Sequence, residues 1–308
     1  MNKVLTEKIV VGNTASGQEI TIDKFTVDSG KAGKTVFVQG GIHGGEVTLP
    51  IFRELFDFAK ENLCAGKIIF VPFCNKMAWA QVCYAYTVGK FSLVSGTDFN
   101  RVFDKDVKCL SDKNMEILGE IIKKSDFYLD LHTARTSTPF GVICDKKMLR
   151  YAKIANLPLT QLLDNPSKYK GCSIDFAAKH NVPALVIECG CHDDVNDQNT
   201  QTAVHAVLSI LVELGVLSYK TKRTNESFYF TNQVTLTAPI AGIAVFKKSV
   251  GETVKKGEVL FQIMPPDLTA RVYDCVAEFD GTVLEIRKTH IFNQFDVVMD
   301  VIKSKEII

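Results

Sequence analysis

The stretch VFVQGGIHGGE, residues 36–46, decides the fold. It begins with a mostly apolar run, and a glycine-rich turn that carries His43 and Glu46 follows directly. A short apolar run that ends in glycines is typical of a buried strand in a parallel sheet. We therefore expect a strand over residues 36–39, with His43 and Glu46 just past its carboxyl end.

Four further short apolar runs are candidates for strands of the same sheet. They occupy residues 68–73, 127–131, 141–144 and 184–187. Between most of these runs, apolar residues recur at helical spacing, around residues 47–59, 115–122 and 204–214. Strands that alternate with helices indicate an α/β fold with a mostly parallel sheet covered on both faces. We also expect an antiparallel edge hairpin at residues 19–27 and Ser111 as the N-cap of the second helix.

The composition is that of an ordinary soluble globular protein. Apolar residues make up 46% of the chain and charged residues 23%, and the formal net charge is +1. Because basic residues are not in surplus, binding to nucleic acid or to a membrane surface is not expected. No stretch approaches the roughly 18 apolar residues of a membrane span, and residues 1–13 lack a signal-peptide core, so we expect a cytoplasmic protein.

The nine cysteines are odd in number and irregularly spaced. This pattern favours reduced, buried thiols over a disulfide framework. Only Cys189 and Cys191, followed by His192, suggest a metal site. Successive residues of a strand point to opposite faces, so Cys189 would point away from Glu188, and a cysteine-based metal site is disfavoured.

A change of character near residue 220 predicts two domains. The 308 residues exceed what one hydrophobic core usually fills. Residues 220–225 are polar, and short strands and turns follow them. We therefore predict a larger α/β domain over residues 1–223 and a C-terminal all-β domain over residues 224–308.

The C-terminal domain contains a weak internal repeat. Residues 238–245 (APIAGIAV) are echoed by residues 275–283 (CVAEFDGTV). This pattern resembles the biotinyl and lipoyl carrier fold, a flattened barrel of two quasi-repeated β units. Such carriers present a modified lysine on the hairpin between their halves, but residues 264–270 contain no lysine. A carrier function is therefore disfavoured, and we expect this domain to narrow the mouth of the active site.

His43, Glu46, His132 and Glu188 each follow a candidate strand. In an open α/β sheet, residues just past the carboxyl ends of the strands converge on the crevice where ligands bind. Two histidines and a carboxylate are a usual ligand set for catalytic zinc, Zn²⁺, which keeps a fourth position for water. His43 and Glu46 are three apart, so one helical turn would bring them together. The alternative for this pair is a helix start with an exposed histidine and a glutamate favoured by the helix dipole.

Asp130 lies two residues before His132 on the same candidate strand. Both side chains should therefore point to the same face of the sheet. A carboxylate there could orient a ligand histidine through its other ring nitrogen. The alternative is a core aspartate that bonds to the backbone at a strand end.

Asn100 and Arg101 suggest a different property, the binding of a carboxylate. A guanidinium fork binds a carboxylate through two hydrogen bonds, and the neighbouring amide can complete the contact. The pair therefore indicates a substrate with a free carboxylate. The alternative is an arginine in a surface salt bridge.

The order of these motifs resembles the zinc carboxypeptidase superfamily, and within it the succinylglutamate desuccinylase and aspartoacylase branch. The motifs are HGGE at residues 43–46, DFNRVF at 98–103, DLH at 130–132 and the strand that ends at Glu188. The resemblance implies a mixed, mainly parallel sheet between helices. It also implies that His43, Glu46 and His132 bind zinc, that Asn100 and Arg101 hold the α-carboxylate of an N-acyl amino acid, and that Glu188 is the general base and acid.

Two departures from the family pattern bear on the substrate. Family members usually have another arginine shortly before the Asn-Arg pair to stabilise the oxyanion, where this chain has only Lys90. Arg135 is the candidate for this role or for binding a substrate carboxylate, unless it pairs with a surface acid. Aspartoacylase-like enzymes also have an arginine in the segment before the catalytic strand, where residues 169–175 offer only Lys170. A different N-acyl amino acid is therefore expected.

The leading prediction is a zinc-dependent amidohydrolase that cleaves a small N-acyl amino acid to a carboxylate and a free amino acid. One alternative is a zinc carboxypeptidase that acts on peptides, and another is a ligand-binding protein without catalysis. The expected partner is a small molecule, and the sequence leaves the formation of a homo-oligomer open.

Overall fold

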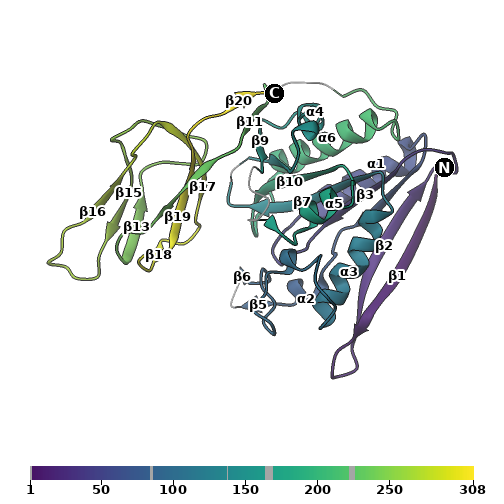
Figure 1. The fold of residues 1–308 in the computed structure, drawn as a ribbon, viewed down its shortest axis with the longest axis horizontal. Helices are drawn as coiled ribbons and strands as arrows, with labels where there is room; N and C mark the ends of the chain where they lie inside the picture. The colour runs from purple at the N-terminus through teal and green to yellow at the C-terminus, as the bar shows by residue number, and fades with distance from the viewer. Residues whose placement is uncertain (1, 84–85, 137, 164–168, 222–225) are drawn as a thin grey trace.

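The computed structural model describes residues 2–83, 86–136, 138–163, 169–221 and 226–308. In this part of the chain, a ten-stranded mixed sheet lies between two layers of helices, and two four-stranded antiparallel sheets form a separate C-terminal unit (Figure 1). The predicted fold class is therefore confirmed: a mainly parallel α/β sheet followed by an all-β region.

The large sheet contains all five strands predicted from the apolar runs. Its order is β1 (Lys3–Asn13), β2 (Glu19–Asp28), β4 (Lys67–Val71), β3 (Thr35–Gly40), β7 (Phe127–Ala134), β10 (Ala184–Cys191), β8 (Phe140–Ile143), β9 (Leu159–Leu162), β11 (Phe228–Phe230) and β20 (Glu306–Ile307). The central strands β4, β3, β7 and β10 are parallel. The stretch 19–27, predicted to be an edge hairpin by itself, is one strand, β2, and its antiparallel hairpin partner is β1. β2 also pairs antiparallel with β4.

Helices cover both faces of this sheet (Figure 1). One layer contains α1 (Leu49–Asn62), α4 (Leu149–Ala155) and α6 (Asp197–Glu213), and the other contains α2 (Lys76–Trp79), α3 (Leu110–Lys123) and α5 (Ser173–Lys179). Two 3-10 turns, η1 (Phe99–Arg101) and η2 (Lys146–Met148), lie in loops. None of the helices in the described ranges is long and apolar enough to cross a membrane.

The N-terminus of α3 differs from the prediction. Cys109 takes the N-cap position with an extended backbone, and Ser111 lies inside the helix. The Asp112 carboxylate accepts a hydrogen bond from the Lys108 backbone N–H at 3.0 Å. An acidic side chain of the first turn therefore closes the helix start, and the serine is not needed there.

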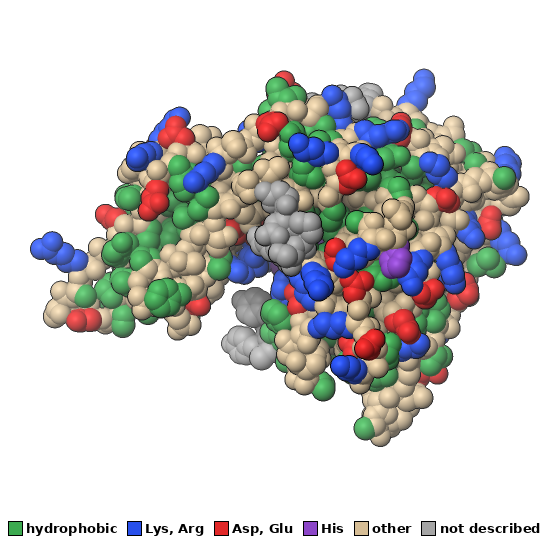
Figure 2. Space-filling view, viewed as in Figure 1, with side chains coloured by type: hydrophobic (Ala, Val, Ile, Leu, Met, Phe, Trp, Pro, Cys, Tyr) green, Lys and Arg blue, Asp and Glu red, His purple; other side chains and the backbone are tan. Residues whose placement is uncertain are grey.

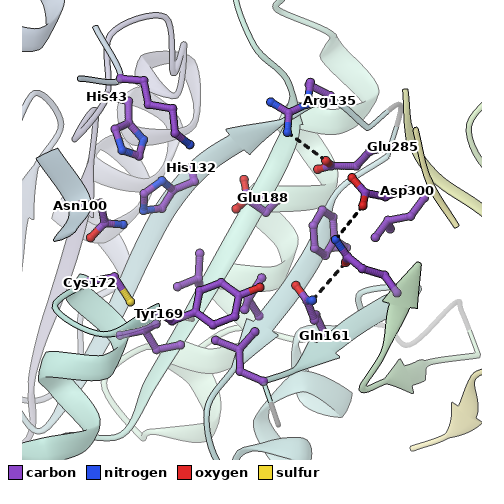
Figure 3. Close-up of a pocket in the computed structure, with 18 of the residues that line it drawn as sticks. His43, Asn100, His132, Arg135, Gln161, Tyr169, Cys172, Glu188, Glu285 and Asp300 are labelled. Atoms are coloured by element: carbon purple, nitrogen blue, oxygen red, sulfur yellow. Dashed lines mark hydrogen bonds and ion pairs between the residues drawn. The ribbon is translucent and has the colours of Figure 1, made fainter. Parts of the chain in front are cut away.

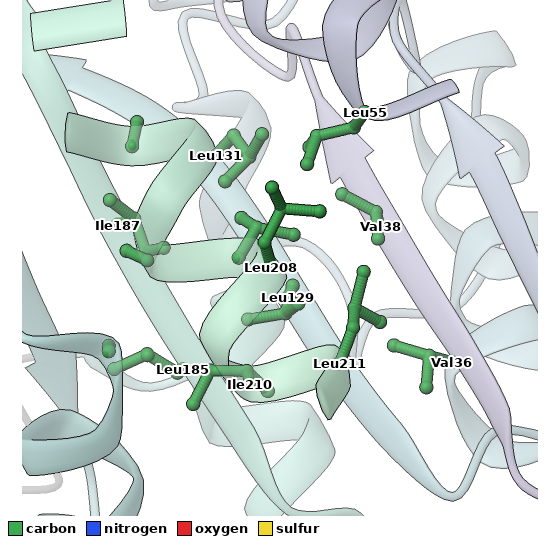
Figure 4. Close-up of a cluster of buried hydrophobic side chains, with 14 of the residues drawn as sticks. Val36, Val38, Leu55, Leu129, Leu131, Leu185, Ile187, Leu208, Ile210 and Leu211 are labelled. Carbon is green, nitrogen blue, oxygen red and sulfur yellow. The ribbon is translucent and has the colours of Figure 1, made fainter. Parts of the chain in front are cut away.

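The apolar stripe of α6 packs on the centre of the sheet. Figure 4 shows Leu208 and Leu211 against Val36, Val38 and Leu129 of the parallel strands. These side chains are buried, and burial of each large apolar side chain contributes about 1.5–3 kcal/mol to folding. The packed centre holds β3, β7 and β10 in register, so their carboxyl ends lie side by side.

The C-terminal unit has the repeated organisation expected of the carrier-like fold. One sheet contains β12 (Gln233–Thr237), β19 (Val297–Ile302), β17 (Gly281–Ile286) and β14 (Thr253–Val254). The other contains β16 (Tyr273–Val276), β15 (Val259–Met264), β13 (Gly242–Phe246) and β18 (Ile291–Phe292). The first four strands and the last four occupy equivalent places with the two sheets exchanged, and residues 265–272 link the halves.

Two strands from the region assigned to the C-terminal domain belong to the large sheet. β11 pairs parallel with β9, and β20 pairs antiparallel with β11. The predicted boundary between residues 223 and 224 lies outside the described residues.

Candidate active site

His43 and Glu46 lie on the glycine-rich turn that follows β3. Gly41 and Gly45 have φ angles of 70° and 80°, which side chains rarely adopt. The His43 backbone N–H donates to Oε2 of Glu46 at 3.1 Å. Helix α1 begins only at Leu49, so a tight turn brings the two side chains together, and the expected helical turn is not present.

His132, near the end of β7, completes a cluster with these two residues. Oε1 of Glu46 is 2.7 Å from Nδ1 of His43 and 2.9 Å from Nδ1 of His132. The exposed fractions of His43, Glu46 and His132 are only 7%, 1% and 5%. Figure 3 shows the two imidazoles side by side at one end of a cavity. Across the described part of the chain, this is the one group of three such side chains placed to share a metal ion.

The charges in this cluster fit a bound cation. Burial alone would raise the pKa of Glu46, but His132 and His43 outweigh it and hold that pKa well below its ordinary value. Burial would lower the pKa of His132, but Asp130 and Glu46 raise it well above its ordinary value. Positive charge is therefore strongly favoured between these groups. Two imidazole nitrogens and a carboxylate oxygen that point at one another are the donor set that zinc prefers.

A carboxylate lies behind each histidine of the cluster. Oδ2 of Asp130 is 3.0 Å from Nε2 of His132, and Oδ1 of Asp98 is 3.0 Å from Nε2 of His43. Such carboxylates orient ligand histidines and make them more basic. Burial would raise the pKa of Asp98, but His43 lowers it to about 2.

From the sequence we predicted that Asp130 lies beside a ligand histidine, but we did not predict this for Asp98. Asp130 follows from strand alternation, because it is two residues from His132. Asp98 is 55 positions from His43 in the chain, and loop packing decides their contact. One feature of the sequence could have identified Asp98: it begins the DFNR motif that also contains Asn100 and Arg101.

Glu188 lines the same cavity from the neighbouring strand. β10 is parallel to β7, and Glu188 is in register with His132. Oε2 of Glu188 is buried and has no hydrogen-bond partner among the described residues. Burial raises the pKa of this carboxyl to about 7. Cys189, the next residue, packs in the apolar cluster on the other side of the sheet, as strand alternation predicted.

Asn100 and Arg101 lie on η1, at the wall of the cavity. Oδ1 of Asn100 accepts a hydrogen bond from the Ser173 backbone N–H at 2.8 Å, which fixes the amide. Nη1 of Arg101 donates to the Asn100 backbone oxygen at 2.6 Å, and its guanidinium lies 5.9 Å from the Tyr169 ring centre. Both predicted carboxylate-binding residues therefore reach the cavity that contains His132 and Glu188.

The cavity has a volume of about 370 Å³ and is partly lined by the C-terminal unit. Figure 2 shows a hollow between this unit and the rest of the molecule, with Lys and Arg side chains at its edge. Arg135 also lines the cavity, and its Nη2 is 3.3 Å from Oε2 of Glu285 on β17. Its acidic partner is thus part of the cavity wall. The C-terminal region therefore forms part of the cavity wall, and the narrowing of the mouth stays a prediction.

Comparisons with known proteins place this site in a family. The model of the succinylglutamate desuccinylase/aspartoacylase catalytic domain matches residues 32–214, more than half of the chain. The chain belongs to the succinylglutamate desuccinylase/aspartoacylase family. A comparison with curated proteins found no match.

Several solved structures share the fold over almost the whole chain. A succinylglutamate desuccinylase/aspartoacylase structure from Shewanella frigidimarina has a TM-score of 0.89 at 18% identity and covers 100% of this chain and 99% of its own. The product-bound ectoine utilization protein from Ruegeria pomeroyi has a TM-score of 0.83 at 18% identity, with coverage of 98% and 95%. An aspartoacylase family protein from Mesorhizobium loti has a TM-score of 0.79 at 22% identity, with coverage of 99% and 96%. At these identities the likeness establishes the fold.

Membership of the succinylglutamate desuccinylase/aspartoacylase family confirms the predicted resemblance. The family is one of amide hydrolases, and its catalytic-domain match contains all the motifs quoted above. The clustering of His43, Glu46 and His132 agrees with the predicted metal ligands.

Proposed function

We propose that this protein is a zinc-dependent amidohydrolase that removes the acyl group from a small N-acyl amino acid. One observation carries the proposal. Glu188 is a buried carboxylate without a partner among the described residues, and it faces the same cavity as the His43, Glu46 and His132 cluster. A free carboxyl beside a metal site is the arrangement that general-base hydrolysis of an amide requires.

In this proposal, His43, Glu46 and His132 would hold the zinc ion. When bound there, zinc supplies Lewis acidity toward a carbonyl and lowers the pKa of water. Asp98 and Asp130 keep the two imidazoles in the tautomer and orientation that direct Nδ1 inward.

Glu188 moves the proton. Its carboxylate takes a proton from the attacking water and later returns it to the leaving nitrogen of the amide. A pKa of about 7 suits both steps, because the group exchanges protons readily near neutral pH. The acyl group leaves as a carboxylic acid, and the amine leaves as a free amino acid.

The remaining polar residues of the cavity bind the substrate. Arg101, beside the fixed amide of Asn100, holds the α-carboxylate of the amino acid. Arg135 stabilises the developing oxyanion or binds a second carboxylate, and Glu285 holds its guanidinium in place.

The cavity size favours this function over a peptidase. A volume of about 370 Å³ is at the low end for small-molecule sites. We propose that the division into domains of residues 1–223 and 224–308 excludes polypeptides from the cavity. The second domain supplies a wall that a polypeptide would have to cross. Hydrolysis of long peptides would favour the carboxypeptidase alternative.

Metal analysis and a substrate screen test the proposal. The purified protein should contain about one zinc per chain, and it should hydrolyse at least one member of a panel of N-acetyl, N-formyl and N-succinyl amino acids. Glu188→Gln should retain the zinc and lose turnover. A metal-free active enzyme would overturn the proposal, and so would a Glu188→Gln variant with full turnover.

A further inference from the structure

Three polar side chains form a row on the wall that the C-terminal unit contributes to the cavity. Thr235 on β12 is directly opposite Asp300 on β19, and Asp300 is directly opposite Glu285 on β17. Directly opposite side chains of antiparallel strands lie on the same face, about 5 Å apart. All three line the cavity, so two carboxylates are neighbours on its wall.

Asp300 is held in place by uncharged groups. Its Oδ1 accepts hydrogen bonds from Oγ1 of Thr235 at 2.6 Å and from Nε2 of Gln233 at 3.2 Å. Oε1 of Gln233 in turn accepts from Nε2 of Gln161 on β9 at 3.2 Å, which fixes the direction of the amide. Oδ2 of Asp300 has no hydrogen-bond or ion-pair partner among the described side chains, although the residue is only 6% exposed.

The row of Thr235, Asp300 and Glu285 lies at the end of the cavity away from the metal ligands. Figure 3 shows Glu188 between His132 on one side and Glu285 with Asp300 on the other. Apolar side chains also line the cavity, among them Phe140, Val142, Leu163, Val186, Leu284 and Val297. A ligand that spans the cavity can therefore contact aliphatic side chains as well as the carboxylates at this end.

Two arginines lie near this end. Nη2 of Arg135 lies 3.3 Å from Oε2 of Glu285, so this arginine has an acidic partner. Arg287 also lines the cavity, but within the described ranges it forms no ion pair with Glu285 or Asp300. Asp300 thus forms no ion pair within the described ranges, although the charge of Arg287 acts on both carboxylates from a greater distance. Two like charges directly opposite in a sheet are unfavourable unless a cation joins them.

We propose that Asp300, with Glu285 beside it, binds an ammonium group at the end of an aliphatic chain of the substrate. This inference rests on the proposed function, since it specifies the N-acyl amino acid as one with a cationic end. The hydrogen bonds from Thr235 and Gln233 occupy one oxygen and orient the other, as in a prepared cation site. The aliphatic wall contacts the methylene groups that separate the ammonium from the scissile amide.

Binding of the free amino acids tests this without catalysis. Calorimetry on the full-length protein would compare L-ornithine, its uncharged isostere L-norleucine, and L-glutamate. Ornithine should bind at least about tenfold more tightly than the other two, the effect of one charged hydrogen bond. The Asp300→Asn variant, which keeps both donors occupied, should lose most of this preference.

The matched control is Asp280→Asn. Asp280 is an exposed acid of the same unit, 2.9 Å from Lys255 and away from the cavity wall. This variant should keep the full preference for ornithine. Equal or tighter binding of norleucine or glutamate by the wild type would overturn the proposal, and so would an unchanged preference in Asp300→Asn. The wild-type comparison stands even if Asp300→Asn does not fold.

Turnover then tests the same preference in the reaction. N-acetyl-ornithine, which has the ammonium on the amino acid, should exceed N-acetyl-norleucine by about tenfold in kcat/KM. Hydrolysis of both without this difference would overturn the proposal. Failure of all N-acyl amino acids with the ornithine preference intact would contradict only the proposed hydrolysis.

Discussion

Glu188 and His132 are paired positions of the parallel strands β10 and β7. This register places the free carboxylate and one member of the histidine cluster at the same edge of the sheet, in one cavity. Parallel strands end at a common edge of the sheet. The distance between Glu188 and His132 is therefore set by the two strands and not by a loop.

The first prediction concerns Glu188 as a proton carrier. Replacement by glutamine keeps the size of the side chain but removes its basic oxygen, so kcat should fall by roughly 10²–10⁴-fold. The measurement is kcat together with zinc content for each protein. Glu213→Gln, on the exposed end of α6, is the control and should keep both values. Loss of zinc from Glu188→Gln would show that Glu188 is a ligand and not a base.

The second prediction is a pH profile. Burial raises the pKa of Glu188 to about 7, and only the ionised form can accept a proton from water. Turnover should therefore rise with pH on the acidic limb, with a midpoint at or below about 7, because the positive charge of bound zinc favours the ionised carboxylate. A profile measured from pH 5 to 9 under conditions that keep zinc bound checks this, and a flat profile across pH 5 to 8 would contradict the assignment.

The third prediction is a gain in stability when Glu188 is replaced by the uncharged glutamine. The pKa of Glu188 is raised from 4.5 to about 7, so ionisation is harder in the folded protein than in the unfolded chain. The penalty is absent below pH 4.5 and complete above pH 7, where it is about 3 kcal/mol. Metal-free Glu188→Gln should thus be more stable than metal-free wild type at pH 8 and equally stable at pH 4. Urea unfolding at both pH values measures this, and equal stability at pH 8 would contradict it.

The fourth prediction concerns the carboxylates behind the histidines. Asp98→Asn and Asp130→Asn should each weaken zinc binding by about 10–100-fold, because each removes the charge that orients a ligand imidazole. Competition with a chelator measures the affinity. Asp57→Asn, an exposed acid paired with Lys60 on α1, should leave it unchanged. Wild-type affinity in both site variants would remove these residues from the metal site.

Much of this architecture could be predicted from the sequence because periodicity reports burial. The central strands are apolar on both faces, so they are visible as short runs, and the residues after them must share an edge. Strand alternation was enough to place Asp130 beside His132 and Cys189 away from Glu188. β1 was not recognised by itself, since its residues are mostly exposed and it follows no simple apolar pattern.

Contacts that depend on how distant parts pack could not be predicted. Asp98 reaches His43 through a loop, and Glu285 reaches Arg135 because the C-terminal unit is placed against the sheet. No local sequence pattern encodes either of these two contacts. For the same reason, the row of Thr235, Asp300 and Glu285 was not visible in the sequence, where these residues are separated by 50 and 15 positions.

The most direct test of the central claim is anomalous diffraction at the zinc edge from crystals of the protein loaded with one equivalent of zinc. We expect a single strong peak enclosed by Nδ1 of His43, Nδ1 of His132 and the Glu46 carboxylate, with Glu188 facing it across the cavity. A peak elsewhere, or no peak at this cluster after loading, would contradict the claim that these three side chains form the metal centre of the enzyme.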